Sequence, residues 1–142
     1  MTENRIRPVS NGAETTLLPE LPDPGAPSAD QLIELSVRRP AKGTVVLGVS
    51  GEIDMFTTPL LRTALDEQLT AKTDRLVLDL SQVSFLGSSG LAVLVDCLHL
   101  AEDNGVGFCL VSATRSVERP LKVTGLGDVF STFPTVSAAL AA

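Results

Sequence analysis

One continuous segment, RLVLDLSQVSFLGSSGLAVLV from Arg75 to Val95, constrains the fold of this chain more than any other. It opens with the apolar run RLVLDL, which has the length and composition of a buried strand. A polar loop follows, and apolar residues then recur with helical spacing from Ser88 to Asn104, where Gly105 favours a stop. Because the patterns on both sides of the strand are helical, we predict a mostly parallel, buried strand inside a sheet.

The same alternation of strand and helix continues along the chain. Thr57 and Thr58 followed by Pro59 predict a helix start, whereas Pro120 predicts a kink or an early end in a later helix. Apolar patterns predict further strands within residues 32–37, 45–49, 108–111 and 129–133, and further helices within 57–69, 114–125 and 136–142. The order β-β-α-β-α-β-α-β-α predicts one α/β domain built on a central sheet.

The beginning of the sequence differs from the rest in composition. Its prolines are Pro8, Pro19, Pro22, Pro24 and Pro27. The first 30 residues hold two basic and five acidic residues, so they carry −3 of the net charge of −6, and they show no sustained apolar period. We therefore predict that residues 1–29 form a disordered or loosely packed extension and that the domain spans 30–142. The alternative is a tail that masks a surface or binds a partner.

Composition excludes several classes of protein. An acidic chain repels phosphate backbones, so we expect no nucleic-acid binding. The apolar runs are too short for a transmembrane helix and the first residues lack the apolar core of a secretory signal. We therefore expect a cytoplasmic protein without membrane insertion. One His and two Cys do not supply an ordinary zinc site, and we expect neither a metal nor a cofactor.

An enzyme is also disfavoured. The only histidine, His99, lies about three turns along the predicted helix from Ser88 and cannot reach its hydroxyl as a base. The sequence contains no GxSxG, GxxxxGK[ST] or GxGxxG motif. A small hydrolase or a nucleotide-binding enzyme is therefore the weaker alternative, and we expect a protein that is not an enzyme.

Ser88 and Ser89 lie at the predicted start of the helix. We expect Ser88 near the N-cap and Ser89 near the first turn, where free backbone N–H groups and the helix dipole attract anions. A phosphoryl group on either serine would add about −1.5 to −2 of charge to an exposed end of the domain without unfolding it. The simpler interpretation is that the SSG segment serves only as a capping signal.

Several motifs together resemble the STAS domain of the stand-alone bacterial anti-sigma factor antagonists. They are GEID at 51–54, LVLDLSQVSFLGSSGLAVLV at 76–95, FCLV at 108–111 and TRSVERPLKVTGLGDVF at 114–130, and the resemblance covers about residues 31–140. It implies a single domain with a mixed sheet of four to five strands and about four helices packed mainly on one face. It also implies a protein that binds an anti-sigma factor and thereby frees a sigma factor.

The resemblance further implies a switch at the serine pair. By position, Ser88 matches the serine that is phosphorylated by an anti-sigma factor with serine kinase activity, and Asp54 matches an acidic residue of the partner-facing region. The phosphorylated form does not bind, and a serine phosphatase restores the unphosphorylated one. This chain departs from the family at Gly87, where an Asp usually precedes the serines. That loss is expected to weaken kinase docking or change the local electrostatics, with Ser89 as the substitute acceptor.

The helix after the serines carries two apolar stripes. At about 100° per residue, the expected core face consists of Leu91, Leu94, Val95, Leu98 and Ala101. Val93, Cys97 and Leu100 form a second stripe roughly opposite, although a helix that lies on a sheet needs only one. We predict that Val93 and Leu100 are partly exposed and contact the partner. The predicted partner-binding residues are therefore Asp54, Gly87, Ser88, Ser89, Val93 and Leu100. The alternative is that a neighbouring helix or the N-terminal tail covers this stripe.

Cys97 and Cys109 are the only cysteines, one on the predicted helix and one on the next strand. Two buried thiols are the simplest expectation for a protein without an export signal. The alternative is a redox-sensing disulfide, which would make a redox-switched antagonist. For the whole domain, the alternative is a STAS interaction module of another complex, such as one for lipid transport or stress sensing.

Overall fold

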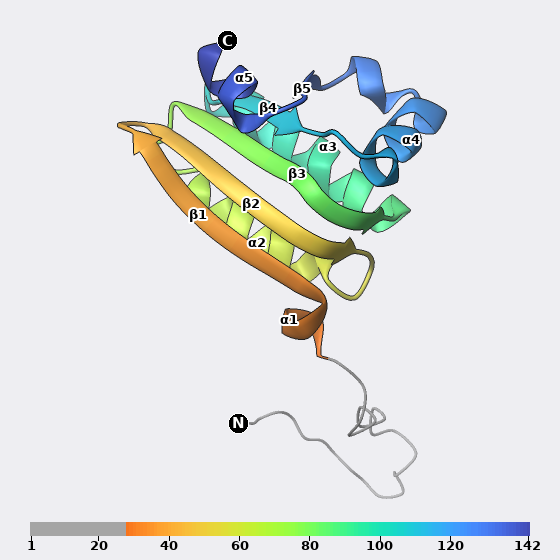
Figure 1. The fold of residues 1–142 in the computed structure, drawn as a ribbon. Helices are drawn as coiled ribbons and strands as arrows, with labels where there is room; N and C mark the ends of the chain where they lie inside the picture. The colour runs from red at the N-terminus through yellow and green to blue at the C-terminus, as the bar shows by residue number, and fades with distance from the viewer. Residues whose placement is uncertain (1–27) are drawn as a thin grey trace, which may run out of the picture.

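The computed structural model describes residues 28–142, which form a five-stranded sheet flanked by helices (Figure 1). The strands follow the order β1-β2-β3-β4-β5 across the sheet, with the bounds Ile33–Ala41, Thr44–Ile53, Arg75–Leu86, Gly107–Val111 and Ser131–Phe133. The helices are α1 (Ala29–Leu32), α2 (Thr58–Gln68), α3 (Ser88–Asp103), α4 (Arg115–Thr124) and α5 (Val136–Ala141), with a 3-10 turn, η2, at Leu126–Asp128. The pair β1–β2 is antiparallel and the other neighbours are parallel, which confirms the predicted α/β domain with a mixed sheet.

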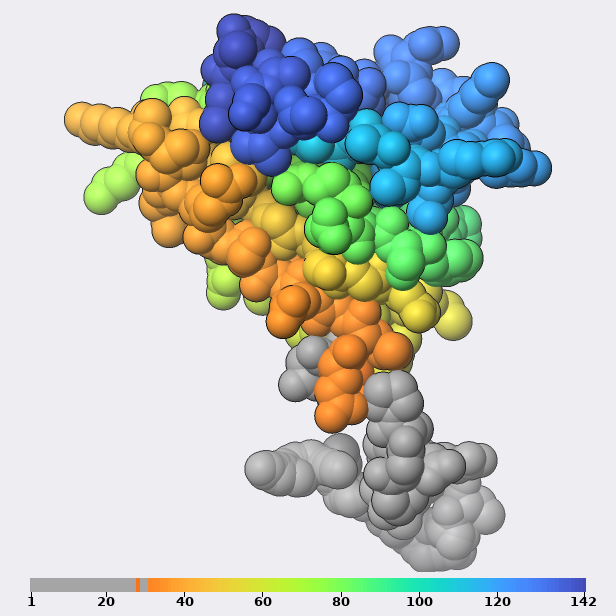
Figure 2. Space-filling model, viewed as in Figure 1, coloured from red at the N-terminus to blue at the C-terminus, as the bar shows by residue number. Residues whose placement is uncertain are grey.

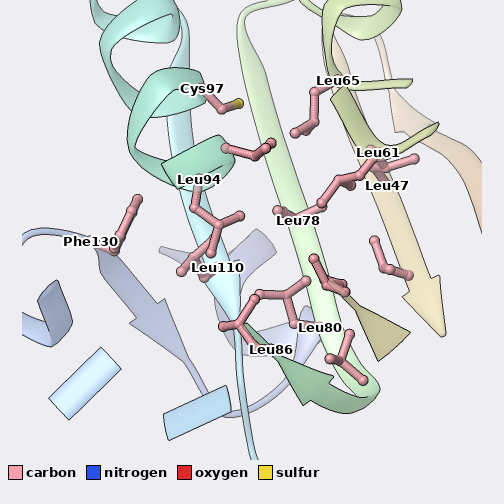
Figure 3. Packing of buried hydrophobic residues seen from close by; sticks show 14 of the residues in the cluster. Leu47, Leu61, Leu65, Leu78, Leu80, Leu86, Leu94, Cys97, Leu110 and Phe130 are labelled. Atoms are coloured by element: carbon pink, nitrogen blue, oxygen red, sulfur yellow. The ribbon is translucent and has the colours of Figure 1, made fainter. Parts of the chain in front are cut away.

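The helices cover the two faces of the sheet unequally. Figure 1 shows α2 and α3 together on one face and α5 on the other. Leu76 and Leu78 of β3 belong to the large core under α2 and α3, whereas Val77 between them packs in a small cluster with Ala139 of α5. This alternation is the ordinary period of a strand. Leucines of α2 and α3 converge on Leu78 (Figure 3). Since α4 also contributes to the large core, the prediction of helices mainly on one face is confirmed.

The strand β3 extends beyond its predicted end. Residues 81–86, predicted as a polar loop, continue the strand as far as Leu86. The pairing of β2 with β3 is irregular at two places along this stretch. Such bulges let a strand continue although its buried residues no longer alternate strictly. The apolar pattern alone therefore predicts the end of the strand too early, at Leu80.

The helix α4 contains Pro120, for which the sequence predicts a kink or an early end. The helix does not end early: it continues to Thr124, because burial of Val117 and Leu121 on either side of the proline holds it against the core. One strand prediction needs correction. The last strand is shorter than predicted and begins only at Ser131, because the chain just before it forms η2 and a turn.

The predicted extension falls largely outside the described residues. Nothing in the structure describes residues 1–27, so an extension over 1–29 and a domain from residue 30 stay predictions. No described helix combines the length and apolarity needed to cross a bilayer. Within residues 28–142, no group of three or more His, Cys, Asp or Glu side chains could hold a metal ion.

Candidate functional site

The ends of β2 and β3 meet at one edge of the domain, and the candidate site lies there (Figure 1). Ile53 at the end of β2 pairs with Leu86 at the end of β3. The Gly87 N–H, directly after β3, donates a hydrogen bond to the Ile53 carbonyl oxygen at 2.9 Å. Asp54 and Ser88, which follow these two residues in the chain, are therefore brought to the same edge, as the resemblance implies.

Ser88 is the first residue of α3, and its side chain is exposed. Gly87 is the N-cap, and its carbonyl oxygen accepts the first helical hydrogen bond from the Leu91 N–H at 3.1 Å. The N–H groups that precede Leu91 have no acceptor within the helix, and the positive end of the helix dipole lies there. An anionic group attached to Ser88 would thus lie in a favourable local field. Ser89 is half-buried and less accessible.

Gly90 allows the start of α3 to pack closely onto the sheet. A Cβ atom at this position would lie 2.5 Å from Ile53 Cγ2 and 2.7 Å from Leu86 Cδ1. Non-bonded carbon atoms do not approach that closely, so a larger residue would push α3 away from the ends of β2 and β3. Gly90 therefore sets the position of Ser88 relative to the sheet.

Asp54 holds the connection between β2 and α2. Its Oδ1 atom accepts hydrogen bonds from the backbone N–H groups of Phe56 at 2.9 Å and Thr57 at 3.0 Å. The buried Thr57 hydroxyl accepts from the Asp54 N–H at 3.0 Å and donates to the Glu52 carbonyl oxygen at 2.7 Å. These reciprocal bonds are similar to a capping box. Asp54 therefore has a structural role in addition to the partner-facing role that the resemblance implies.

Three large apolar side chains are exposed at the same edge. Met55 and Phe56, in the connection after β2, are 82% and 54% exposed, and Phe85 near the end of β3 is 50% exposed. The Phe85 ring lies against Gly87, where an added Cβ would stand 3.1 Å from Cε2. We call Asp54, Met55, Phe56, Phe85 and Ser88 the Ser88 surface. Clustered exposed apolar side chains of this kind are typical of protein-binding surfaces.

Sequence reasoning did not select Met55, Phe56 or Phe85. Their exposure depends on which elements cover them, and the periodicity of the sequence does not report it. One signal could have found them: they stand just after GEID and just before GSSG, in segments predicted as loops, where a large apolar side chain has no obvious core to enter.

The prediction of a partly exposed apolar stripe on α3 is wrong at Val93. This side chain is 4% exposed and belongs to the large core, whereas Leu100 is 39% exposed as predicted. The helix α2 lies beside α3, and Arg62 of α2 forms a salt bridge of 3.0 Å with Asp96 of α3. Because α3 therefore packs against a helix as well as the sheet, more than one arc of it is covered. Burial by a neighbouring helix was the alternative interpretation of the stripe.

Cys97 and Cys109 are both buried and unbridged, which confirms the expectation of two buried thiols. Cys97 belongs to the large core, whereas Cys109 belongs to the small cluster with α5 on the opposite face. The sheet lies between them, so the alternative of an intramolecular redox disulfide is wrong for this fold.

Burial, helped by the nearby Asp66 carboxylate, raises the pKa of the Cys97 thiol to about 12. Burial also raises the pKa of Cys109, although the Arg75 cation opposes it.

The fold and the site define a small α/β domain with an exposed serine at a strand–helix junction and an apolar surface beside it. The STAS domain family matches residues 37–139 of the chain. The anti-sigma-F factor antagonist RsfB of Mycobacterium tuberculosis is 37% identical over 98 residues, which cover 69% of this chain and 80% of that protein. This chain belongs to the STAS domain family.

Solved structures agree with this assignment. An anti-sigma factor antagonist from Mycobacterium paratuberculosis superposes with a TM-score of 0.69 and 38% identity, over 77% of this chain and 92% of that one. The anti-sigma factor antagonist SpoIIAA in its unphosphorylated form superposes with a TM-score of 0.65 over 75% of this chain and 93% of that one. At 18% identity, this second likeness shows a shared fold.

Proposed function

We propose that this STAS domain is an anti-sigma factor antagonist whose Ser88 surface binds an anti-sigma factor and thereby releases a sigma factor. The observation that carries the proposal is the exposed Ser88 at the start of α3, beside the exposed Met55, Phe56 and Phe85. The similarity to RsfB, and to RsfA of Mycobacterium tuberculosis at 32% identity, supports the same function.

The apolar side chains of the Ser88 surface supply the binding energy in this proposal. A few buried anchors carry most of the energy of an interface, and Phe and Met are enriched there. The hydrogen bonds of Asp54 hold the backbone on which Phe56 stands, and the Phe85 ring rests against Gly87. Such preorganisation lowers the entropy lost on binding. Leu100, which is exposed farther along α3, is a further proposed contact.

Phosphorylation of Ser88 switches this binding off. The partner is an anti-sigma factor with serine kinase activity. The Ser88 oxygen takes the γ-phosphoryl group of ATP, the hydroxyl proton passes to the kinase, and ADP leaves. A serine phosphatase reverses the step by hydrolysis, in which water takes the phosphoryl group and the serine hydroxyl is restored.

The added charge explains why phosphorylation would prevent docking. Neither residues 51–56 nor residues 81–96 contain Lys or Arg, and Asp54 adds a negative charge at the same edge. A phosphate of about −1.5 to −2 would have to be desolvated against the apolar anchors, and these two segments supply no cation to pair with it. Residues 31–142 hold nine basic and twelve acidic side chains and so carry a net charge of −3. One phosphate would change this net charge by about half or more.

Gly87 changes the site without removing the acceptor. Its φ of −88° is open to any residue, so the backbone does not require glycine here. Relative to an Asp at this position, the glycine removes one carboxylate from the surface that the kinase must approach. We keep Ser88 as the acceptor because its side chain is exposed, whereas Ser89 is half-buried.

The test begins by capturing a partner protein with the full chain. If this partner is an anti-sigma factor, it must also bind a sigma factor, and the two proteins must compete for it. Incubation of that partner with ATP should add one phosphate to the wild type and to Ser89→Ala but none to Ser88→Ala, as read by intact-mass analysis. The phosphorylated wild type should lose binding, and Ser88→Ala should keep it. A phosphate on Ser88→Ala would move the acceptor to Ser89. A captured partner that binds no sigma factor would refute the function.

A further inference from the structure

Ser112, the residue directly after β4, carries a buried hydroxyl without a hydrogen-bond partner. Ser112 is only 6% exposed, and its backbone N–H donates a hydrogen bond to the Phe133 carbonyl oxygen at 3.0 Å. Among the described residues, no group bonds to its Oγ atom. An unpaired buried hydroxyl lowers stability, and folded proteins contain few of them. The position therefore points to an external hydrogen-bond partner.

Ser112 is one of the residues that line a cavity of about 330 Å³, which is bounded by α4, η2 and β5. The polar walls of this cavity are Ser112, Glu118, Lys122, Asp128 and Thr132. It opens beyond the carboxyl end of β4, the side of a parallel sheet on which α/β proteins bind ligands. Its volume lies at the lower end of the range for ligand sites, which suits a molecule of few heavy atoms.

The cavity brings together charges of both signs. Lys122 and Glu118 project from α4, and Asp128 belongs to η2. Within residues 28–142, none of these three side chains forms an ion pair. Among the wall groups, an ammonium and hydroxyls suit a carboxylate of a ligand, and carboxylates suit an ammonium group of a ligand. A ligand that carries both groups on one small skeleton therefore matches the walls.

We propose that this cavity, which we call the Ser112 cavity, binds a small zwitterion of the size of an α-amino acid. The ligand carboxylate lies at the Ser112 hydroxyl and the Lys122 ammonium, and the ligand ammonium lies at Glu118 and Asp128. The Ser112 hydroxyl thereby gains the acceptor that it lacks within the chain. No residue of this cavity belongs to the Ser88 surface, so the proposal goes beyond the proposed function and does not depend on it.

The test uses the full chain and individual L-α-amino acids, with acetate and methylamine at the same concentration as half-ligands. At least one amino acid should raise the unfolding temperature, since a ligand that binds only the folded state stabilises it. In NMR titrations, that amino acid should shift the amide signals of Ser112 and Gly127 but not that of Ser88. The proposal is overturned if no amino acid acts at millimolar concentration, or if acetate alone acts equally, which would indicate an adventitious ion only.

Replacement of Ser112 separates a ligand-binding hydroxyl from a structural one. Ser112→Ala should leave the unfolding temperature of the free protein unchanged or higher, because it removes an unpaired group, and should weaken zwitterion binding about tenfold or more. The matched control Ser116→Ala, on α4 but outside the cavity wall, should keep the affinity. Unchanged affinity in Ser112→Ala overturns the proposal. A lower unfolding temperature of the free variant also overturns it, since the hydroxyl would then be paired within the protein.

Discussion

The Gly87 N–H donates to the Ile53 carbonyl oxygen at 2.9 Å, and this hydrogen bond joins the ends of β2 and β3. Gly87 is also the N-cap of α3, so the same residue couples the sheet to the helix that begins with Ser88. Asp54 follows the acceptor in the chain, and Ser88 follows the donor. The geometry of the candidate switch thus depends on the pairing of two strands that are distant in sequence.

Gly90→Ala should displace the start of α3. The added methyl group would meet Ile53 Cγ2 at 2.5 Å, so we expect a loss of about 1–3 kcal/mol in the free energy of unfolding. Urea denaturation measures this loss. Gly107→Ala is the matched control, because its Cβ would meet nothing closer than the Asp74 carbonyl oxygen at 3.7 Å, and it should change stability by less than about 1 kcal/mol. Equal losses in the two variants would contradict the steric argument.

Phe85→Ser should weaken binding without unfolding the protein. The side chain is half exposed, so stability should change by about 0.5 kcal/mol or less, whereas loss of an interface anchor should cost about 2 kcal/mol of binding, or about 30-fold in affinity. Calorimetric titration with the captured anti-sigma factor gives the affinity. Val123→Ser, on the exposed face of α4, provides the control and should bind normally. Normal binding by Phe85→Ser would remove this residue from the interface.

Two substitutions at Asp54 separate its structural role from its charge. Asp54→Ala loses the acceptor of the Phe56 and Thr57 N–H groups and should lower the free energy of unfolding by about 1–2 kcal/mol. Asp54→Asn keeps an oxygen acceptor and should lose much less. Thermal and urea unfolding compare the two variants. Equal stability losses would show that the charge, and not the hydrogen bonds, supports the connection between β2 and α2.

Val93 and Leu100 should respond differently to a charged replacement. Val93→Asp places a carboxylate in the large core and should destabilise the domain by more than about 3 kcal/mol or abolish folding. Leu100→Asp, at an exposed position, should leave the circular dichroism spectrum and the unfolding temperature nearly unchanged. A folded and stable Val93→Asp protein would mean that this side chain is accessible after all.

The stability of the domain should fall at alkaline pH through Cys97. Its pKa rises from 9.0 to about 12 on folding, so above pH 9 the unfolded chain releases a proton that the folded protein retains. Stability should therefore decrease as the pH rises between these two values, by up to about 1.4 kcal/mol per pH unit. Urea unfolding of the wild type and Cys97→Ala across this range measures the effect. A stability difference between the two proteins that stays constant with pH would contradict it.

Local patterns in the sequence account for most of the architecture. The sequence places the start of α2 at Pro59 and the end of α3 before Gly105, because backbone preferences act within a few residues. The side-chain cap expected from Thr57 does not form: its hydroxyl bonds to Glu52 and Asp54 instead. The serines at the start of α3 are also evident from the sequence alone. The bulged ends of β2 and β3 are not evident from the sequence, since each is maintained by hydrogen bonds to the other strand beyond the point where the apolar pattern stops.

The sequence by itself determined the α/β class, the position of Ser88 at a strand–helix junction and the likeness to the STAS family. Only the tertiary structure decided which apolar residues form the surface. Val93 is buried and Phe85 exposed, although both are large apolar residues near Ser88 in the sequence. The physical reason is that burial depends on the elements that pack against a residue. The helix α2, which packs beside α3, and the sheet that separates Cys97 from Cys109 are built from segments far apart in the sequence. No local pattern predicts that these segments come together.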